Sequence, residues 1–326
     1  MRNLKKIRLV GVIISIMILT TSCVPPGSML WGYIDKSGEY VIEPVFEEVR
    51  MFKEELAAVK LSSKGKWGFI NKKGEFAIKP KFDAVLWFSE GLAAFRDGNE
   101  KNGKWGFINT KGEIVIPAQF KNAKLFTEGL APVQVDDEMN SRWGFINTKG
   151  EFIIEPVYSN VSIFSEDLAP VQITKGGNKG WVYIDKQNNI ILDPEYDNVS
   201  IFNEGIAIVG MNENNGWKWG AIDKQGNEII EPTIPVYLAN FHEGLARFVV
   251  EIGEKSTLMG YIDTTGQKVI EEKYTLAGDF YENLACVRDK SKNWGFINKD
   301  GEYVIESKYL SVGDFSEGLA PVLQQK

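Results

Sequence analysis

A motif built around a tryptophan-glycine pair recurs eight times in this chain of 326 residues, in units of about 35 to 40 residues. If the first residue of the pair is position zero, position three is Ile in every copy, and position seven is Gly in every copy but one, which has Asn188. The copies begin at Trp31, Trp67, Trp105, Trp143, Trp181, Trp219, Met259 and Trp294. Because a fixed period through most of a chain is typical of repeat architectures, the sequence predicts one array and not two separate cores.

Position seven predicts a β-hairpin turn in each copy, because Gly and Asn adopt a positive φ at the lowest cost. The segments on either side, such as 67–70 (WGFI) and 75–78 (EFAI), are rich in aromatic and β-branched residues, as strands are. Proline follows the second segment in five copies, which is typical of a strand end or an edge strand. No segment after residue 22 keeps a helical period. The sequence therefore predicts an all-β protein.

The combined pattern is W-G-[FY]-I-[DN]-x-x-G-E followed by F-x-E-G-L-A, and it resembles the bacterial WG-repeat family, also described by a KWG signature as at Lys66-Trp67-Gly68. The resemblance covers residues 31–326, and Trp181-Val182 and Met259-Gly260 depart from the pattern in ways we expect the scaffold to tolerate. It implies an exported or envelope-associated protein of β-rich repeats without catalytic activity. The signature residues are the seven repeat tryptophans Trp31, Trp67, Trp105, Trp143, Trp181, Trp219 and Trp294, with Gly68, Gly106 and Gly144 among the paired glycines.

The two ends of the array look complementary. Trp31 begins a strand that has no partner upstream, and Leu319–Leu323 form a strand that has no partner downstream. Pairing these half-hairpins would close a ring and leave neither edge open. We therefore expect a β-propeller-like closed ring of about eight short units, with an open β-solenoid of the same repeats as the alternative.

The N-terminus predicts export. Residues 1–22 have a basic start and an apolar run too short to span a membrane comfortably, which indicates a signal peptide. The sequence from Leu19 to Cys23 resembles a lipobox, so we expect Cys23 to be lipidated, with residues 23–30 as a short linker to the ring. The expected location is the bacterial cell membrane or envelope surface. A secreted protein cut nearby and an uncleaved anchor are the alternatives.

Charge argues against polyanionic partners. The chain has 37 basic and 44 acidic residues, and without residues 1–22 the balance is 33 to 44, a net charge of −11. No clustered Lys/Arg stripe is present, so a nucleic acid is not expected as a partner. Contact with the membrane is expected only through the lipid anchor.

The sequence offers few residues that could carry out catalysis. We therefore expect no enzymatic activity, no cofactor and no metal site. The Phe-x-Glu carboxylate recurs in all eight copies, so we expect it to hold a turn or join repeats, since a glycosidase needs two carboxylates in different environments. His242 is the only histidine, and Cys286 fills a small apolar slot, which predicts a buried thiol. The Asp/Asn-x-x-Gly turns lack the ligand spacing of a calcium loop.

Seven polar loops between copies vary in sequence, whereas the repeat positions on either side of them do not. In repeat folds such variable loops lie on one face. The loops are residues 62–66, 96–104, 136–142, 174–180, 211–218, 251–258 and 288–293. If these loops bind a ligand, the candidate contacts are Asp97, Asn99, Asp136, Asp137, Asn178, Asn212, Asn214 and Asn215. Neutral drift in solvated loops is the competing interpretation.

The repeat tryptophans allow two interpretations, because they could fill space between repeats or stack on sugar rings. Met259 replaces one of them and stacks poorly on a sugar, which favours core packing. The sequence as a whole predicts an envelope-anchored binding scaffold without catalytic activity, whose partner is an envelope protein or peptide. The alternative is a module that binds glycan or peptidoglycan. An enzyme would need a unique polar constellation, which the sequence does not reveal.

Overall fold

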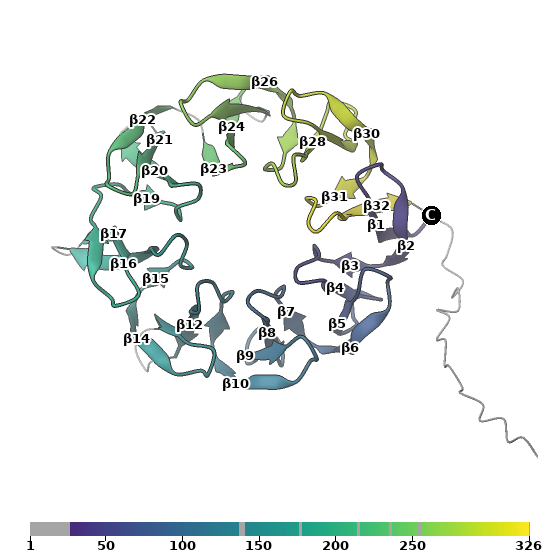
Figure 1. The fold of residues 1–326 in the computed structure, drawn as a ribbon, viewed down its shortest axis with the longest axis horizontal. Helices are drawn as coiled ribbons and strands as arrows, with labels where there is room; N and C mark the ends of the chain where they lie inside the picture. Colours follow the sequence, from purple (N-terminus) through teal and green to yellow (C-terminus); the bar gives the residue numbers. More distant parts are fainter. Residues whose placement is uncertain are drawn as a thin grey trace, which may run out of the picture.

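The computed structural model describes residues 27–136, 141–175, 178–213, 216–234, 237–252 and 256–325. Over these residues the chain forms eight four-stranded antiparallel sheets and no helix. The sheets stand as blades around a common axis (Figure 1). The expected all-β closed ring, a β-propeller, is therefore confirmed.

Each blade has an inner, a second, a third and an outer strand. The inner strands lie nearest the axis (Figure 1) and are β3 (Glu48–Val49), β7 (Ala84–Val85), β11 (Asn122–Ala123), β15 (Asn160–Val161), β19 (Asn198–Val199), β23 (Leu238–His242), β27 (Leu276–Ala277) and β31 (Ser311–Val312). The second strands are β4 (Ala57–Lys60), β8 (Leu92–Asp97), β12 (Ala131–Val135), β16 (Ala169–Lys175), β20 (Ile206–Glu213), β24 (Leu245–Glu251), β28 (Ala285–Arg288) and β32 (Ala320–Gln325).

The two remaining strands of each blade carry the tryptophan-glycine pair and the segment after the hairpin turn. The third strands are β5 (Trp67–Ile70), β9 (Lys104–Asn109), β13 (Arg142–Ile146), β17 (Asn178–Ile184), β21 (Gly216–Asp223), β25 (Thr257–Asp263), β29 (Trp294–Ile297) and β1 (Met29–Ile34). The outer strands are β6 (Phe76–Phe82), β10 (Ile114–Phe120), β14 (Phe152–Tyr158), β18 (Ile190–Leu192), β22 (Glu228–Ile234), β26 (Lys268–Tyr274), β30 (Tyr303–Tyr309) and β2 (Tyr40–Phe46). We number the blades 1 to 8 from β3–β6 onward.

The two ends of the chain close the ring in blade 8. This blade has the order β2-β1-β32-β31, and β1 pairs with β32 from Met29↔Gln325 to Ile34↔Ala320. The predicted pairing of the two half-hairpins is therefore correct, and it excludes the open solenoid. Each sequence repeat supplies the third and outer strands of one blade and the inner and second strands of the next, so the repeats interlock neighbouring blades.

The core lies between neighbouring blades. The Phe of each Phe-x-Glu motif is at most 2% exposed. At seven of the eight junctions it packs against an aromatic ring on the third strand of the preceding blade, with ring centroids 4.7–5.0 Å apart, as for Phe69 and Phe88. Such tilted and edge-on pairs are a favourable aromatic geometry. Burial at these junctions holds the ring together.

The glycine of the tryptophan-glycine pair lets the outer strand bulge over the third strand. Between the pairs Trp105↔Phe120 and Phe107↔Ile116, the outer strand advances four residues and the third strand two. A Cβ on Gly106 would lie 2.4 Å from the Ile116 carbonyl oxygen, and the equivalent glycines meet the same obstacle at 2.4–2.7 Å. The pair is therefore a packing signature.

Blade 4 shows what happens without this glycine, because Val182 takes its place. Its outer strand β18 has three residues where the other outer strands have seven, and the pairing with β17 stops at Tyr183↔Leu192. The scaffold tolerates the departure, as expected, but with a shortened outer strand.

The ring has two different faces. Turns of the Phe-x-Glu type join inner to second strands, and turns of the Asp/Asn-x-x-Gly type join third to outer strands. In antiparallel blades both emerge on one side, which we call the turn face. The second-to-third loops and the crossovers between blades emerge on the other side, the loop face. Hydrogen bonds within each side agree with this assignment, such as the Gly98 N–H to Asp83 Oδ2 at 3.0 Å on the loop face.

Candidate functional site

The turn face is organised by a ring of eight glutamates, Glu54, Glu90, Glu128, Glu166, Glu204, Glu243, Glu282 and Glu317. Each has a φ of 53–56° and is the first central residue of a two-residue hairpin turn. The second central residue is usually Gly and also has a positive φ, which is the pattern of a type I′ turn. A left-handed conformation costs a non-glycine residue about 1–2 kcal/mol, so an offsetting interaction is needed.

That interaction is a hydrogen bond to the next blade. The carboxylate of Glu54 accepts from the Gly91 N–H at 2.9 and 3.1 Å, and that of Glu166 accepts from the Gly205 N–H at 3.0 and 3.2 Å. The same bond recurs at all eight junctions, including the bond between blades 8 and 1, where Glu317 accepts from the Glu55 N–H at 3.0 Å. The predicted structural role of these glutamates is therefore correct. On this face the glutamate carboxylates therefore bond to backbone groups of the protein itself.

Lysines neutralise part of this ring. Five copies carry Lys at position five of the repeat, and each makes an ion pair of 2.9–3.3 Å with a ring glutamate; these are Lys36, Lys72, Lys186, Lys224 and Lys299. Burial raises the pKa of Glu166, but the Gly205 N–H and Lys224 outweigh it, and the pKa is lower than usual. The turn face is thus a network of internal polar bonds.

The repeat tryptophans pack into the blades with one side. Trp67 is 6% exposed, and the other six are half-buried at the edge of the core clusters. Four of them carry a cation over the ring, such as Arg96 at 5.8 Å from the Trp105 centroid and Lys124 at 5.3 Å from Trp143. A ring that is covered in this way offers a sugar little surface. This geometry agrees with core packing.

The loop face gathers the described candidate contacts on consecutive blades. Asp97 and Asn99 belong to blade 2, Asp136 to blade 3, and Asn212 to blade 5. Asn178 begins β17 of blade 4. Asp137, Asn214 and Asn215, like Cys23, lie outside the described residues.

Some of these candidates form bonds that stabilise the loops themselves. Asn99 Oδ1 accepts hydrogen bonds from the backbone N–H groups of Lys101 and Asn102, so it closes its own loop. Asp136 pairs with Lys104 at 2.8 Å and Lys121 at 3.1 Å, and hydrogen bonds from these two lysines lower its pKa. Asp97 and Asn212 have exposed side chains. The loop face therefore offers polar groups to solvent in addition to those that fix its shape.

An aromatic cluster on the loop face escaped the sequence interpretation. The rings of Trp217 and Trp219 stack with centroids 5.4 Å apart, and Tyr237 meets Trp219 at 5.2 Å in an edge-on arrangement. Gly210 makes room, because a Cβ there would lie 2.9 Å from the Trp219 ring. Trp217 is 39% exposed and Tyr237 50% exposed. Asn212 lies directly opposite Trp217 in the hairpin.

The signal for this cluster was available in the composition. The chain has nine tryptophans, and the repeat accounts for seven, which leaves Trp87 and Trp217 without a role in the motif. Large exposed aromatics beside polar groups are typical of binding surfaces.

The wall nearest the axis is divided into two sectors. The residue immediately before the buried Phe of each Phe-x-Glu motif is half-buried, and we call these eight residues the inner wall. In order from blade 1 they are Met51, Trp87, Leu125, Ile163, Ile201, Asn240, Asp279 and Asp314. Blades 1 to 5 thus present an apolar wall, and blades 6 to 8 present a polar one.

Comparison with known proteins agrees with this geometry. The family described as WG containing repeat matches the chain at 31–64, 67–100, 105–138, 143–176, 181–214, 219–251, 259–292 and 294–326. The chain is a WG-repeat protein. No protein of curated function matches the sequence of this WG-repeat propeller.

Solved structures resemble it in fold. The uncharacterized protein lmo1340 from Listeria monocytogenes EGD-e is 12% identical, with a TM-score of 0.53 over 79% of this chain and 93% of that chain. The β-propeller domain of the Trilobed protease from Pyrococcus furiosus is 13% identical, with a TM-score of 0.51 over 81% and 97%. The tricorn protease is 11% identical, with a TM-score of 0.51 over 93% of this chain and 36% of that one. At these identities the likeness shows the fold alone.

The polar sector of this WG-repeat propeller joins residues that are far apart in sequence. Arg247 Nε donates to Asp279 Oδ1 at 3.3 Å, and Cys286 Sγ donates to Asp314 Oδ1 at 3.3 Å. Cys286 is buried, as predicted, and burial with the Asp314 carboxylate raises the pKa of its thiol well above the usual value. A protonated, enclosed thiol is a poor nucleophile.

In the described part of the chain, no group of three or more His, Cys, Asp or Glu side chains is placed to hold a metal ion. The Asp/Asn oxygens of the third-to-outer turns accept hydrogen bonds from their own backbone instead. Asn71 Oδ1, for example, accepts from the Lys73 and Glu75 N–H groups at 2.9 and 3.1 Å. These turns are held by their own side chains, as Asx turns are.

Proposed function

We propose that this WG-repeat propeller is an envelope-anchored binding scaffold without catalytic activity, and that it holds a protein or peptide partner on its loop face. The observation that carries the proposal is the exposed aromatic cluster of Trp217, Trp219 and Tyr237 beside Asn212. Binding hot spots in protein interfaces are enriched in Trp and Tyr and surrounded by polar contacts.

The contrast between the two faces supports the choice of surface. On the turn face the ring glutamates bond to backbone amides of the next blade, and lysines pair with five of them. On the loop face the aromatic cluster lies on the same side as the exposed Asp97 and Asp136. A partner that covers blades 2 to 5 would meet an aromatic anchor at one end and polar groups along the rest.

The test is a pull-down from detergent-solubilised envelope with residues 24–326, a chain that keeps every strand of the ring. We expect a discrete partner with the wild type and at least a tenfold loss of capture with Trp217→Ala and with Tyr237→Ala. Gln225→Ala is the matched control, because this exposed residue lies in the β21–β22 turn of the same blade but on the turn face. Equal capture by all variants would refute the loop-face assignment.

A glycan ligand is the second candidate, and the exposed rings of Trp217 and Tyr237 favour it. One face of Trp217 is covered by Trp219, and its exposed surface could pack against a sugar ring. Co-sedimentation with purified peptidoglycan tests this candidate. Sedimentation that soluble cell-wall fragments reverse, and that Trp217→Ala abolishes, would assign the glycan.

Export and lipid anchoring are part of the proposal and rest on residues 1–23. Within the described ranges no helix is long and apolar enough to cross a membrane. We expect metabolic labelling with a radioactive fatty acid to mark the wild type and not Cys23→Ala. A Cys23→Ala protein that still fractionates with membranes and carries label would contradict the anchor.

A further inference from the structure

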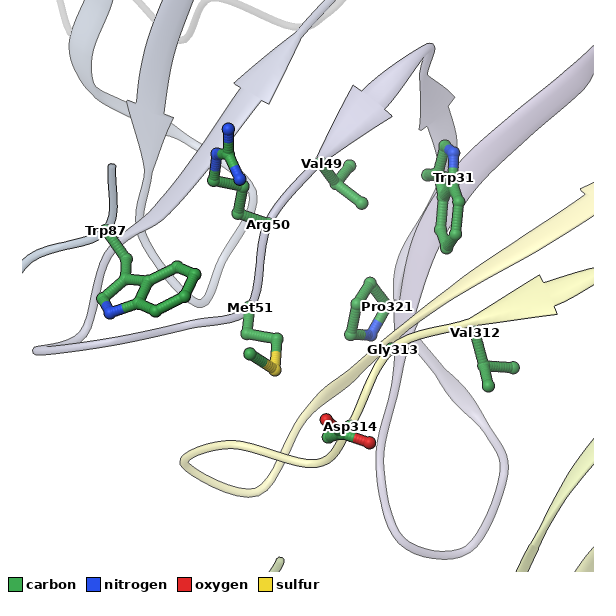
Figure 2. A pocket seen from close by; sticks show the side chains of 9 residues that line it. All are labelled: Trp31, Val49, Arg50, Met51, Trp87, Val312, Gly313, Asp314 and Pro321. Atoms are coloured by element: carbon green, nitrogen blue, oxygen red, sulfur yellow. The ribbon is translucent and has the colours of Figure 1, made fainter. Parts of the chain in front are cut away.

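A pocket of about 230 Å³ opens between blade 1 and blade 8, the blade in which the two ends of the chain pair (Figure 2), and we call it the seam pocket. One side is formed by Val49, Arg50 and Met51 of blade 1 with Trp87 of blade 2. The other side is formed by residues of blade 8, namely Trp31, Val312, Gly313, Asp314 and Pro321. Sites for drug-sized ligands usually measure about 300–1,000 Å³, so this pocket suits a single side chain or a small molecule better than a nucleotide or an oligosaccharide.

The pocket lies where the two sectors of the inner wall meet. Asp314 is the last residue of the polar sector, and Met51 and Trp87 are the first two of the apolar sector. Figure 2 shows Met51 between the Trp87 ring and the Asp314 carboxylate. A ligand in this pocket would therefore meet an anionic group at one end and apolar surface at the other.

Asp314 is the acidic group of the polar sector that lacks a cation. The neighbouring Asp279 has an ion pair with Arg247 at 3.3 Å, whereas no Lys or Arg of the described ranges pairs with Asp314. Its hydrogen bond comes from the Cys286 thiol. Burial raises the pKa of the Asp314 carboxyl, and the thiol and Arg247 partly offset this effect. A cation placed beside Asp314 would relieve the cost of a partly buried carboxylate.

The guanidinium of Arg50, which also lines the pocket, does not contact Asp314. Its guanidinium carbon lies over the Trp67 ring at 5.1 Å, and Figure 2 shows the group directed away from Met51 and Asp314. Trp87 differs from Trp67, because no Lys or Arg in the described part of the chain lies over its ring. The uncovered Trp87 ring lies across Met51 from the Asp314 carboxylate (Figure 2), so it offers apolar surface to the alkyl part of an organic cation.

We propose that the seam pocket binds a primary alkylammonium group, with the ammonium at the Asp314 carboxylate and the alkyl chain over Met51 and the Trp87 ring. The group can belong to a lysine side chain of a peptide or to a free amine, because both present the same chemistry to the pocket. This site is separate from the aromatic cluster of blade 5 and does not depend on the function proposed for the loop face.

Isothermal titration calorimetry with the folded chain tests the proposal. The probes are N-acetyl-lysine methylamide, cadaverine, and the uncharged analogue N-acetyl-norleucine methylamide. We expect at least one of the two amines to bind, and the preferred one identifies the source of the ammonium. The norleucine analogue should bind at least tenfold more weakly than the preferred amine. A norleucine analogue that binds as tightly as the preferred amine, or no binding of either amine, would overturn the proposal.

Two variants locate the site. Asp314→Asn keeps the shape of the side chain and an acceptor for the Cys286 thiol, and we expect it to weaken amine binding at least tenfold. Asp279→Asn is the matched control, because that carboxylate already has Arg247, and its effect should stay within twofold. Thermal unfolding of both variants checks the fold. If Asp314→Asn binds like the wild type, the amine lies elsewhere and the assignment is wrong.

Discussion

Gly106→Ala tests why the repeat requires a glycine after its tryptophan. The new Cβ would lie 2.4 Å from the Ile116 carbonyl oxygen and 2.7 Å from the Ala118 nitrogen. Carbon and oxygen normally approach to about 3.3 Å, so the outer strand must move by roughly 1 Å. These are backbone atoms, which cannot rotate aside as a side chain can.

The cost follows from two contributions. Overpacking of this kind costs about 1–3 kcal/mol. A displaced outer strand also loses ladder hydrogen bonds beyond the bulge, each contributing about 0.5–1.5 kcal/mol. We therefore expect Gly106→Ala to lower the free energy of unfolding by about 2–4 kcal/mol. Blade 4 is the natural precedent, because Val182 at this position accompanies a shortened β18.

Urea unfolding measures the loss, and hydrogen exchange locates it. We expect faster amide exchange at residues 118–120 of β10. Gly91→Ala is the control in the same blade: Gly91 has a φ of +78° and an added Cβ meets nothing within 4 Å. This variant should lower stability through backbone strain, about 1–2 kcal/mol, and leave exchange in β10 unchanged. The reasoning is refuted if Gly106→Ala unfolds like the wild type with normal exchange in β10.

Three further outcomes follow from the structure. Glu166→Ala removes the acceptor for the Gly205 N–H but keeps the left-handed backbone, so urea unfolding should show a free energy of unfolding lower by about 1–2 kcal/mol. Glu166→Gly removes the same acceptor but also relieves the backbone strain, so its free energy of unfolding should fall less. The folded pKa of Glu166 is lower than its usual 4.5, so its contribution is present above that pH and lost as pH falls through the folded pKa; the wild-type melting temperature should fall in this acidic range more than that of Glu166→Gln. Removal of residues 319–326 takes β32 from the seam, and small-angle scattering should then show an enlarged or self-associated particle in place of the compact ring.

The architecture could be predicted because the repeat carries its own geometric constraints. The presence of Gly, or of Asn188, at position seven predicted a backbone with positive φ, and the structure has a positive φ at this position in every copy. The complementary ends, Trp31 and the strand at Leu319–Leu323, predicted the seam. Eight equivalent glutamates excluded an acid-base pair and left a structural role. These inferences needed only residues that are close in sequence or equivalent between copies.

The candidate sites were harder to predict, because they depend on differences between copies. Asp314 and Cys286 are in separate blades and meet only because the ring places one copy against the next. Trp217 is outside the repeated positions, so the pattern that revealed the fold did not include it. Val182 appeared to be a neutral departure, yet it accompanies a shortened outer strand. Comparing the same position across all eight copies would have revealed the divided inner wall.

Site-specific photocrosslinking in intact cells tests most directly whether the loop face is the binding surface. A photoreactive amino acid would replace the exposed Asp97, Asp136 or Asn212 on the loop face, and the exposed Lys73, Lys111 or Lys149 on the turn face. The account predicts a discrete crosslinked adduct from at least one loop-face position and none from the turn-face positions. Adducts from the turn face alone, or none from the loop face, would contradict it.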